Sequence, residues 1–310
     1  MPEPLHTSLV RLLRRDDESL PWEDEHVDRL AVGSRTRVGD YWQGRAGAEL
    51  RVAAAFADLG EKLRDTGTDP AILELLEASV ANELYHAALC EKLATRYLGA
   101  PIPAPSAGRV DLPPLPNVDR PMRTALYAAG LCAVNESIAT VWLEHCFLRA
   151  ATPLARAVNR MHLSDEVLHA RIGWAHLASA WVTRDMRKEL ARWLVPLLKT
   201  NVDQWLASAT LQGFGVPDHG IPDPAEQRAQ VVGAVRNVII PGFDYVGIDA
   251  GAALQCSNGN SPDLAPLDPR IRPTFPYTPP RFALAALRYH SILGQIPVSN
   301  RSQSTRGSRS

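Results

Sequence analysis

Hydrophobic residues recur with a period of three to four positions along most of the chain from about residue 36, and no stretch alternates them with polar residues. This period is typical of amphipathic helices, whereas alternation would predict β-strands. Pairs of a capping residue and a proline mark helix starts at Asp69 with Pro70, Thr152 with Pro153, and Asp223 with Pro224. We therefore expect helices at about 36–65, 70–98, 121–150, 153–182, 184–210 and 224–241.

Proline-rich stretches separate and follow these helices. Residues 99–121 contain seven prolines, which excludes a helix or a central strand and predicts a long connection. Two helices, a long crossover and two more helices predict an all-α four-helix bundle with one crossover, to which additional C-terminal helices are attached.

The same pattern predicts the organisation of the chain. We expect an N-terminal extension over 1–35 and a helical domain with added helices over 36–245. Residues 246–298 should form proline-rich loops and a short helix packed on the bundle, and the polar tail 299–310 should be disordered.

Two of the expected helices carry the same chemical motif in the same register. Glu83 lies thirteen residues after Pro70, Glu166 lies thirteen residues after Pro153, and each glutamate is followed three positions later by a histidine, His86 or His169. Residues three apart share one face of a helix. Each pair can therefore bind one metal ion, and a carboxylate with an imidazole suits iron or manganese.

A di-metal site in a helical bundle needs one more glutamate from each remaining helix. Glu136 is the only charged residue across 124–143, and an unpaired carboxylate there would be costly to bury. On the first helix, Glu49 lies among small and apolar residues. Four glutamates would balance two divalent ions, and without metal they would repel one another.

Two residues are candidates for orienting the histidines. Asn82 and Asp165 directly precede Glu83 and Glu166 at equivalent places in the repeat. Metal-bound histidines usually donate their second N–H to a carboxylate or a carbonyl. We expect Asp165 to orient His86 of the opposite hairpin and Asn82 to orient His169.

Composition and charge exclude several other classes. The chain has 33 basic and 34 acidic side chains and a net charge of −1, so it lacks the basic patch of a nucleic-acid-binding protein. Its four cysteines form no CxxC pair, and we expect Cys90 and Cys132 to be packing residues. No secretory signal or membrane span is evident, which predicts a cytoplasmic protein.

One more histidine narrows the interpretation. His162 lies one turn before Glu166 on the same stripe and can present a third imidazole to the cluster. With this residue the chain resembles the ferritin-like di-iron N-oxygenases of the p-aminobenzoate N-oxygenase family. The resemblance covers about 36–182 and rests, in order, on Glu49, Glu83, His86, Glu136, His162, Glu166 and His169.

The resemblance implies a ferritin-like bundle with two irons, which would use O2 and an external electron donor to oxidise a small organic substrate such as an amine nitrogen. Manganese is the alternative metal, and a homodimer is the expected assembly if the chain is not monomeric. His162 would be the third histidine ligand, Tyr41 would line the substrate cavity and Arg236 would meet a substrate carboxylate.

Several alternatives stay open at this point. Glu49 and Arg45 have the spacing of an ordinary ion pair, His162 and His176 suit a helical core, and Tyr41 and Arg236 suit plain packing or pairing. For the whole chain, the alternatives are a ferritin- or rubrerythrin-like protein that stores iron or scavenges peroxide, and a metal-free helical interaction module.

Overall fold

The computed structural model describes residues 19–105, 115 and 117–251, and every regular element within these ranges is a helix. The one β interaction in this part of the chain is an isolated antiparallel bridge between Val216 and Ile221. The all-α prediction is therefore confirmed. The predictions for four parts of the chain fall wholly or partly outside the described residues: 1–18 of the expected extension 1–35, 106–114 and 116 of the connection 99–121, 252–298 of the segment 246–298, and the whole tail 299–310.

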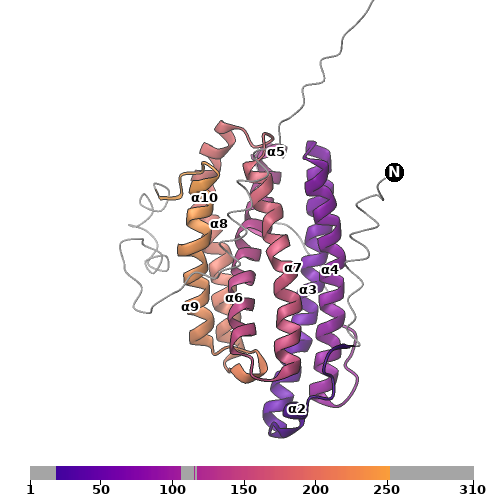
Figure 1. Ribbon diagram of the computed structural model, residues 1–310. Helices are drawn as coiled ribbons and strands as arrows, with labels where there is room; N and C mark the ends of the chain where they lie inside the picture. Colours follow the sequence, from indigo (N-terminus) through magenta and orange to yellow (C-terminus); the bar gives the residue numbers. More distant parts are fainter. Residues whose placement is uncertain (1–18, 106–114, 116, 252–310) are drawn as a thin grey trace, which may run out of the picture.

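Four long rods lie side by side (Figure 1), and they contain all the candidate metal ligands. Three of these rods are single helices, and the third along the chain is made of three consecutive segments. The rods are α3 (Val32–Thr66), α4 (Pro70–Leu98), the run of α5 (Arg120–Tyr127), η2 (Ala128–Asn135) and α6 (Glu136–Arg149), and α7 (Pro153–Ala178). Helices α3 and α4 form one hairpin, and α6 and α7 form the other.

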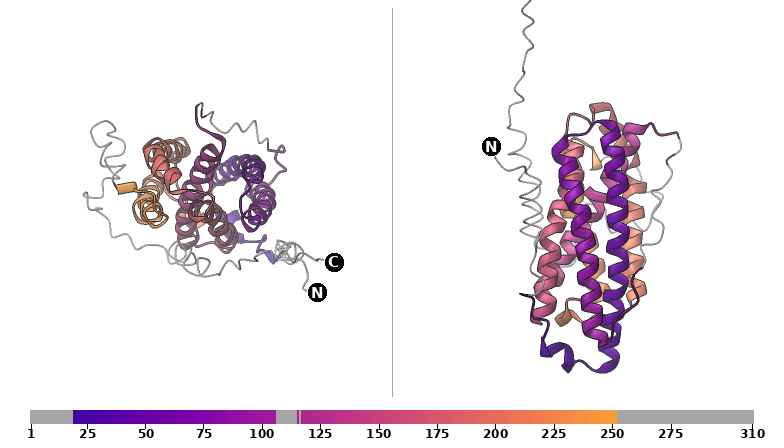
Figure 2. Two further views of the ribbon diagram at one scale, coloured as in Figure 1. Left: turned by 90° about the horizontal axis from the view of Figure 1, so that it is seen from above. Right: turned by 90° about the vertical axis from the view of Figure 1, so that its right-hand side faces the viewer.

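A second layer covers the rod formed by α5, η2 and α6 on the side away from α3 and α4, as the view from above in Figure 2 shows. This layer consists of α8 (Arg184–Gln212), α9 (Pro224–Ala234), η4 (Val235–Ile239) and α10 (Ile240–Tyr245). A large apolar cluster joins it to α7, where Trp174 meets Phe243 edge to face at 5.1 Å between ring centroids. The short helices α2 (Glu25–Arg29) and η3 (Pro217–His219) complete the described fold.

The predicted helix starts are confirmed, but one cap differs. The Asp69 carboxylate caps α4 by accepting a backbone N–H two residues on, at 2.9 Å. Thr152 makes no such bond, because its hydroxyl donates to the Asp218 carbonyl. Instead Asp24, which is distant in sequence, accepts the Leu154 N–H at 2.9 Å. Helix α3 starts at residue 32, four residues before the predicted start at 36. Helix α7 ends at residue 178, four residues before the predicted end at 182.

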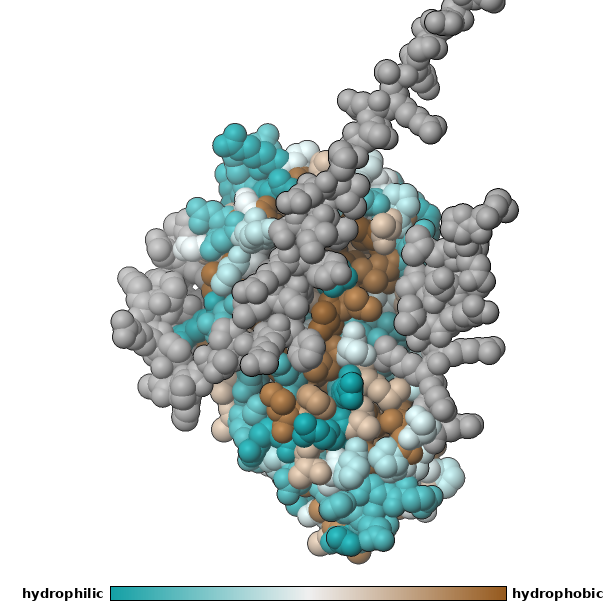
Figure 3. Space-filling model, viewed as in Figure 1, coloured by the Kyte–Doolittle hydropathy of each residue, from teal (hydrophilic) through white to brown (hydrophobic). Residues whose placement is uncertain are grey.

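The third rod is apolar enough to resemble a membrane span, which the sequence analysis did not anticipate. Its run Arg120–Arg149 has a window of mean hydropathy 1.3, and 83% of that window is buried inside the protein. Packing against α7 and the outer layer accounts for these side chains. On the face drawn in Figure 3, hydrophobic residues gather near the middle and hydrophilic residues dominate the lower end.

The third rod also contains an unexpected stretch of π-helix, η2, which ends directly before Glu136. Such wide turns are rare and often occur at functional sites. Gly173 of α7 packs directly on this stretch. A Cβ atom there would overlap the backbone nitrogen of Ala133 and lie 2.7 Å from the carbonyl oxygen of Ala128. The close approach of α7 to η2 therefore requires glycine.

We expect Gly173→Ala to lower the melting temperature, because overpacking against a backbone costs about 1–3 kcal/mol, or about 2–4 °C per kcal/mol for a domain of this size. Thermal unfolding followed by circular dichroism measures the change. The control is Gly44→Ala in α3, where a Cβ atom meets nothing within 4 Å and alanine favours the helix. Equal melting temperatures for both variants would contradict this account of the contact.

Candidate metal centre

The two Glu-x-x-His motifs face each other across antiparallel helices α4 and α7. Nδ1 of His169 lies 2.8 Å from Oε1 of Glu83 and 2.9 Å from Oε2 of Glu166. Nδ1 of His86 lies 3.5 Å from Oε2 of Glu83 and 3.8 Å from Oε1 of Glu166. Each glutamate thus turns one oxygen toward each histidine. Both carboxylates are therefore placed between the two histidines.

The residues expected to orient the histidines lie where the sequence predicted them. Nε2 of His86 is 2.9 Å from the Asp165 carboxylate, and Nε2 of His169 is 3.5 Å from the Asn82 amide nitrogen. Rotation of that amide by half a turn would present its oxygen as the acceptor. Each histidine therefore turns Nδ1 to the centre of the site and Nε2 to the opposite hairpin, which fixes the ring and its tautomer.

Glu136 joins this centre from the third rod. It is 2% exposed, and the Asn135 amide donates to its Oε1 at 3.0 Å. Donor atoms of Glu136, Glu83, Glu166 and His169 lie within 4.8 Å of one another. We call these four residues group B.

Glu49 joins the centre from α3 and brings a cation with it. Donor atoms of Glu49, Glu83, His86 and Glu166 also lie within 4.8 Å of one another, and we call them group A. Arg45 donates to Oε1 of Glu49 from Nη2 at 2.6 Å and from Nε at 3.1 Å. The ion pair that the sequence left open therefore exists, but both partners are largely buried, and Glu49 also faces the metal-suited cluster.

Some donor atoms of group A lack hydrogen-bond partners among the described residues, whereas Nδ1 of His169 is hydrogen-bonded to Oε2 of Glu166 at 2.9 Å. Within the described part of the chain, Nδ1 of His86 and Oε2 of Glu83 have no partner in hydrogen-bond geometry. Their separation of 3.5 Å is too long for a strong hydrogen bond. It suits two ligands that are each about 2.1 Å from one ion. A divalent cation would satisfy both atoms, whereas dry protein leaves them unpaired at a cost.

The electrostatics of the metal-free site show the same shortage of positive charge. Burial, with the charges of Glu166 and Glu83, holds the pKa of Glu136 well above its ordinary value. Burial likewise raises the pKa of Glu49 to about 7, against the effect of Arg45. Although burial opposes it, contacts with Asp165 and Glu83 raise the pKa of His86 to about 10. Without metal, protons thus take the place of cations.

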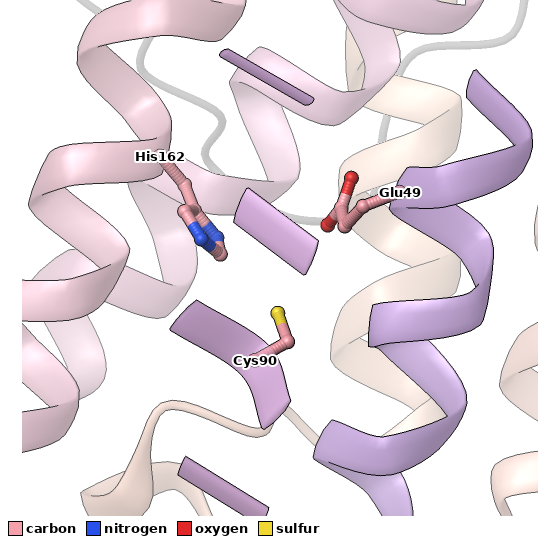
Figure 4. Close-up of side chains that lie close together, drawn as sticks. All are labelled: Glu49, Cys90 and His162. Carbon is pink, nitrogen blue, oxygen red and sulfur yellow. The ribbon is translucent and has the colours of Figure 1, made fainter. Parts of the chain in front are cut away.

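His162 lies in a third group rather than in either of the first two. Its ring is fully buried, 4.3 Å from the ring of His86 between centroids. Donor atoms of His162, Glu49 and Cys90 lie within 4.8 Å of one another, and we call these residues group C. Figure 4 shows the three side chains pointing toward one another from α7, α3 and α4. Cys90 was expected to be a packing residue, although it lies seven residues after Glu83 and so on the same face of α4.

The two substrate residues taken from the resemblance belong to neither group A nor group B, and their roles stay predictions. Tyr41 of α3 packs between two apolar clusters, and burial raises the pKa of its hydroxyl. Arg236 lies in η4 of the outer layer, where its Nε is buried without a hydrogen-bond partner among the described residues.

Several neighbours of the site were missed or misjudged from the sequence. Arg45 lies between two tryptophans, with its guanidinium carbon 5.7 Å from the Trp42 ring centroid and 4.7 Å from that of Trp142. Glu144 of α6 is only 9% exposed, yet it belongs to no described donor group. His176 is the core histidine that was expected, 3.1 Å from the Thr68 hydroxyl.

Comparison with known protein families, characterised proteins and solved structures finds no match for this chain. The function is therefore inferred from the geometry and chemistry of the site.

Proposed function

We propose that this chain is a ferritin-like non-haem di-iron oxygenase that uses O2 to oxidise a small organic substrate, with N-oxygenation of an amine as the specific reaction. The single observation that carries the proposal is the overlap of groups A and B. They share Glu83 and Glu166, and each adds its own histidine and its own terminal glutamate. Groups A and B would hold two ions, with Glu83 and Glu166 available to both, as in other helical bundles that bind two metals.

The donor set favours iron, with manganese as the alternative. Groups A and B offer only carboxylate oxygen and imidazole nitrogen, which suit first-row divalent metals. Four glutamates carry a charge of −4, which two divalent ions neutralise. When bound, two irons would supply the redox chemistry that O2 needs, and an external donor would supply the electrons.

The protein itself would hold, orient and shield the pair. Asp165 and Asn82 keep the imidazole rings turned with Nδ1 inward. Phe56 packs edge to face on His169 at 5.4 Å between ring centroids, and its side chain is fully buried. Such an apolar lining excludes water and limits side reactions. Within this proposal Tyr41 lines the substrate cavity and Arg236 binds a substrate carboxylate.

The decisive test is metal analysis of aerobically purified protein, followed by reduction, exposure to O2 and optical spectroscopy. We expect about two irons per chain and an absorption change on O2 exposure. A panel of aryl and alkyl amines is then screened for oxidised nitrogen products by mass spectrometry.

Each outcome of this test is informative. Substrate-dependent consumption of O2 with an oxidised amine supports the oxygenase. Iron oxidation without any organic product, in a large hollow assembly, would instead indicate iron storage or peroxide scavenging. Protein that binds no iron or manganese, and melts at the same temperature with and without them, would leave a metal-free helical module.

A further inference from the structure

A cysteine, a histidine and a glutamate converge beside the proposed di-metal centre, as Figure 4 shows. We propose that group C, formed by Glu49, Cys90 and His162, is a third metal position that takes a thiophilic divalent cation such as Zn²⁺ or Co²⁺. The proposal goes beyond the oxygenase, because it concerns a separate ion and does not require any reaction with O2.

The helical register places group C one turn beyond the central pair. Cys90 lies seven residues after Glu83 on α4, and His162 lies four residues before Glu166 on α7. Because α4 and α7 run antiparallel, these two displacements lead to the same end of the site. The stripes that carry groups A and B thus continue to a further level, and α3 contributes Glu49 to it.

The other end of the site lacks such a level, although the two hairpins repeat the same motif. The position equivalent to His162 is Ser79, whose hydroxyl donates to the Leu75 carbonyl at 2.9 Å. The position equivalent to Cys90 is Gly173, which has no side chain and packs on η2. The two hairpins therefore differ here: metal-suited residues continue beyond the motif only at the end beside group A.

The donor chemistry of group C differs from that of groups A and B. Thiolate sulfur, imidazole nitrogen and carboxylate oxygen are all ligands of Zn²⁺, and three protein ligands leave a fourth tetrahedral position open. Cys90 and His162 are fully buried and Glu49 is 6% exposed. Glu49 also belongs to group A, so the Cys90 thiolate is the one negative charge that group C adds to the four glutamates.

Arg45 contacts two of the three residues of group C. Both of its hydrogen bonds to Glu49 go to Oε1, which leaves Oε2 to face a cation. Its Nη2 lies 3.5 Å from Nδ1 of His162. Binding of an ion by His162 requires this contact to break, because an imidazole that accepts a hydrogen bond at Nδ1 carries its proton on Nε2 and has no lone pair left for a metal.

The test is a titration of the full-length, metal-depleted protein with Co²⁺, followed by absorption spectroscopy. Binding to a thiolate produces a sulfur-to-cobalt charge-transfer band in the near ultraviolet, which oxygen and nitrogen ligands do not produce. We expect three bound Co²⁺ per chain, with the band arising from one of them. Cys90→Ser should bind two Co²⁺ and lose the band completely.

The control is Cys132→Ser, because Cys132 is equally buried but belongs to no described donor group; it should retain all three ions and the band. If Cys90→Ser does not fold, as judged by circular dichroism, His162→Gln tests the same position and should also lose one ion and the band. Two ions without the band in the unmodified protein would overturn group C and leave the di-metal site standing. One ion with the band would support group C and overturn the di-metal site.

Discussion

Glu83→Gln is expected to weaken the binding of Fe(II) or Mn(II) by more than about 100-fold, because Glu83 belongs to both group A and group B. Loss of a residue that only orients a ligand typically costs 10- to 100-fold in affinity. Loss of a carboxylate that belongs to both groups should lower the affinity for metal at least as much. Anaerobic titration with Mn(II), read by electron paramagnetic resonance of the free ion, measures the affinity.

The same variant should also change how much metal raises the melting temperature. A ligand present at 100 times its dissociation constant stabilises a protein by about 2.7 kcal/mol, which raises the melting temperature by about 5–10 °C in a domain of this size. We expect Mn(II) to produce this rise in the unmodified protein and almost none in Glu83→Gln. Without metal the variant should be no less stable than the unmodified protein, because it removes one of several repelling buried carboxylates.

Glu144→Gln is the matched control for this experiment. Glu144 is a buried glutamate of α6 whose pKa is raised by burial, but it lies in none of the described donor groups. Its variant should keep the full affinity for metal. If Glu83→Gln bound metal as tightly as Glu144→Gln, the proposed centre would be wrong.

The affinity for metal should rise steeply with pH between about 6 and 8. In the metal-free site the pKa of Glu49 is about 7 and that of His86 about 10, and those of Glu136 and His169 are also raised. Metal ions need these groups deprotonated, so binding must release protons. We expect at least two protons per pair of ions at pH 7, which changes the overall binding constant by about 100-fold per pH unit.

The contribution of Glu49 to the stability of the metal-free protein should change in the opposite direction and fall as the pH rises. The pKa of Glu49 is higher in the folded protein, about 7, than its ordinary value of 4.5. Its contribution is therefore fully present below about pH 4.5 and is lost as the pH rises through about 7, by up to about 1.4 kcal/mol per pH unit for one proton. Glu49→Gln should flatten this part of the curve.

Calorimetric titration with Mn(II) in buffers of different ionisation enthalpy counts the released protons, and urea unfolding at several pH values follows the metal-free stability. A count near zero at pH 7 would contradict the electrostatic description of the site. So would equal slopes of metal-free stability between pH 5 and 7 in Glu49→Gln and the unmodified protein; this comparison cancels the opposite effect of His176, whose pKa is lowered to about 4.

The ligand candidates were predictable from the sequence because their placement within a helix is local. Residues three apart on a helix always share a face, so Glu83 with His86, and Glu166 with His169, needed only the correct prediction of a helix. Glu136 stood out because a single charge in a long apolar run must be paired when it is buried. Matching registers in the two hairpins then indicated that the pairs would meet.

Other features depend on contacts between residues that are far apart in the chain, and no local pattern encodes them. The antiparallel register of α4 and α7 decides that Cys90 and His162 reach the same level as Glu49. The fold also decides that Asp24 caps α7 and that Arg45 reaches His162 as well as Glu49. The sequence by itself thus determined the helices and which side chains line one face of each, since helical geometry repeats over a few residues. Only the tertiary structure decided which faces meet and at what level, because packing between distant segments sets both.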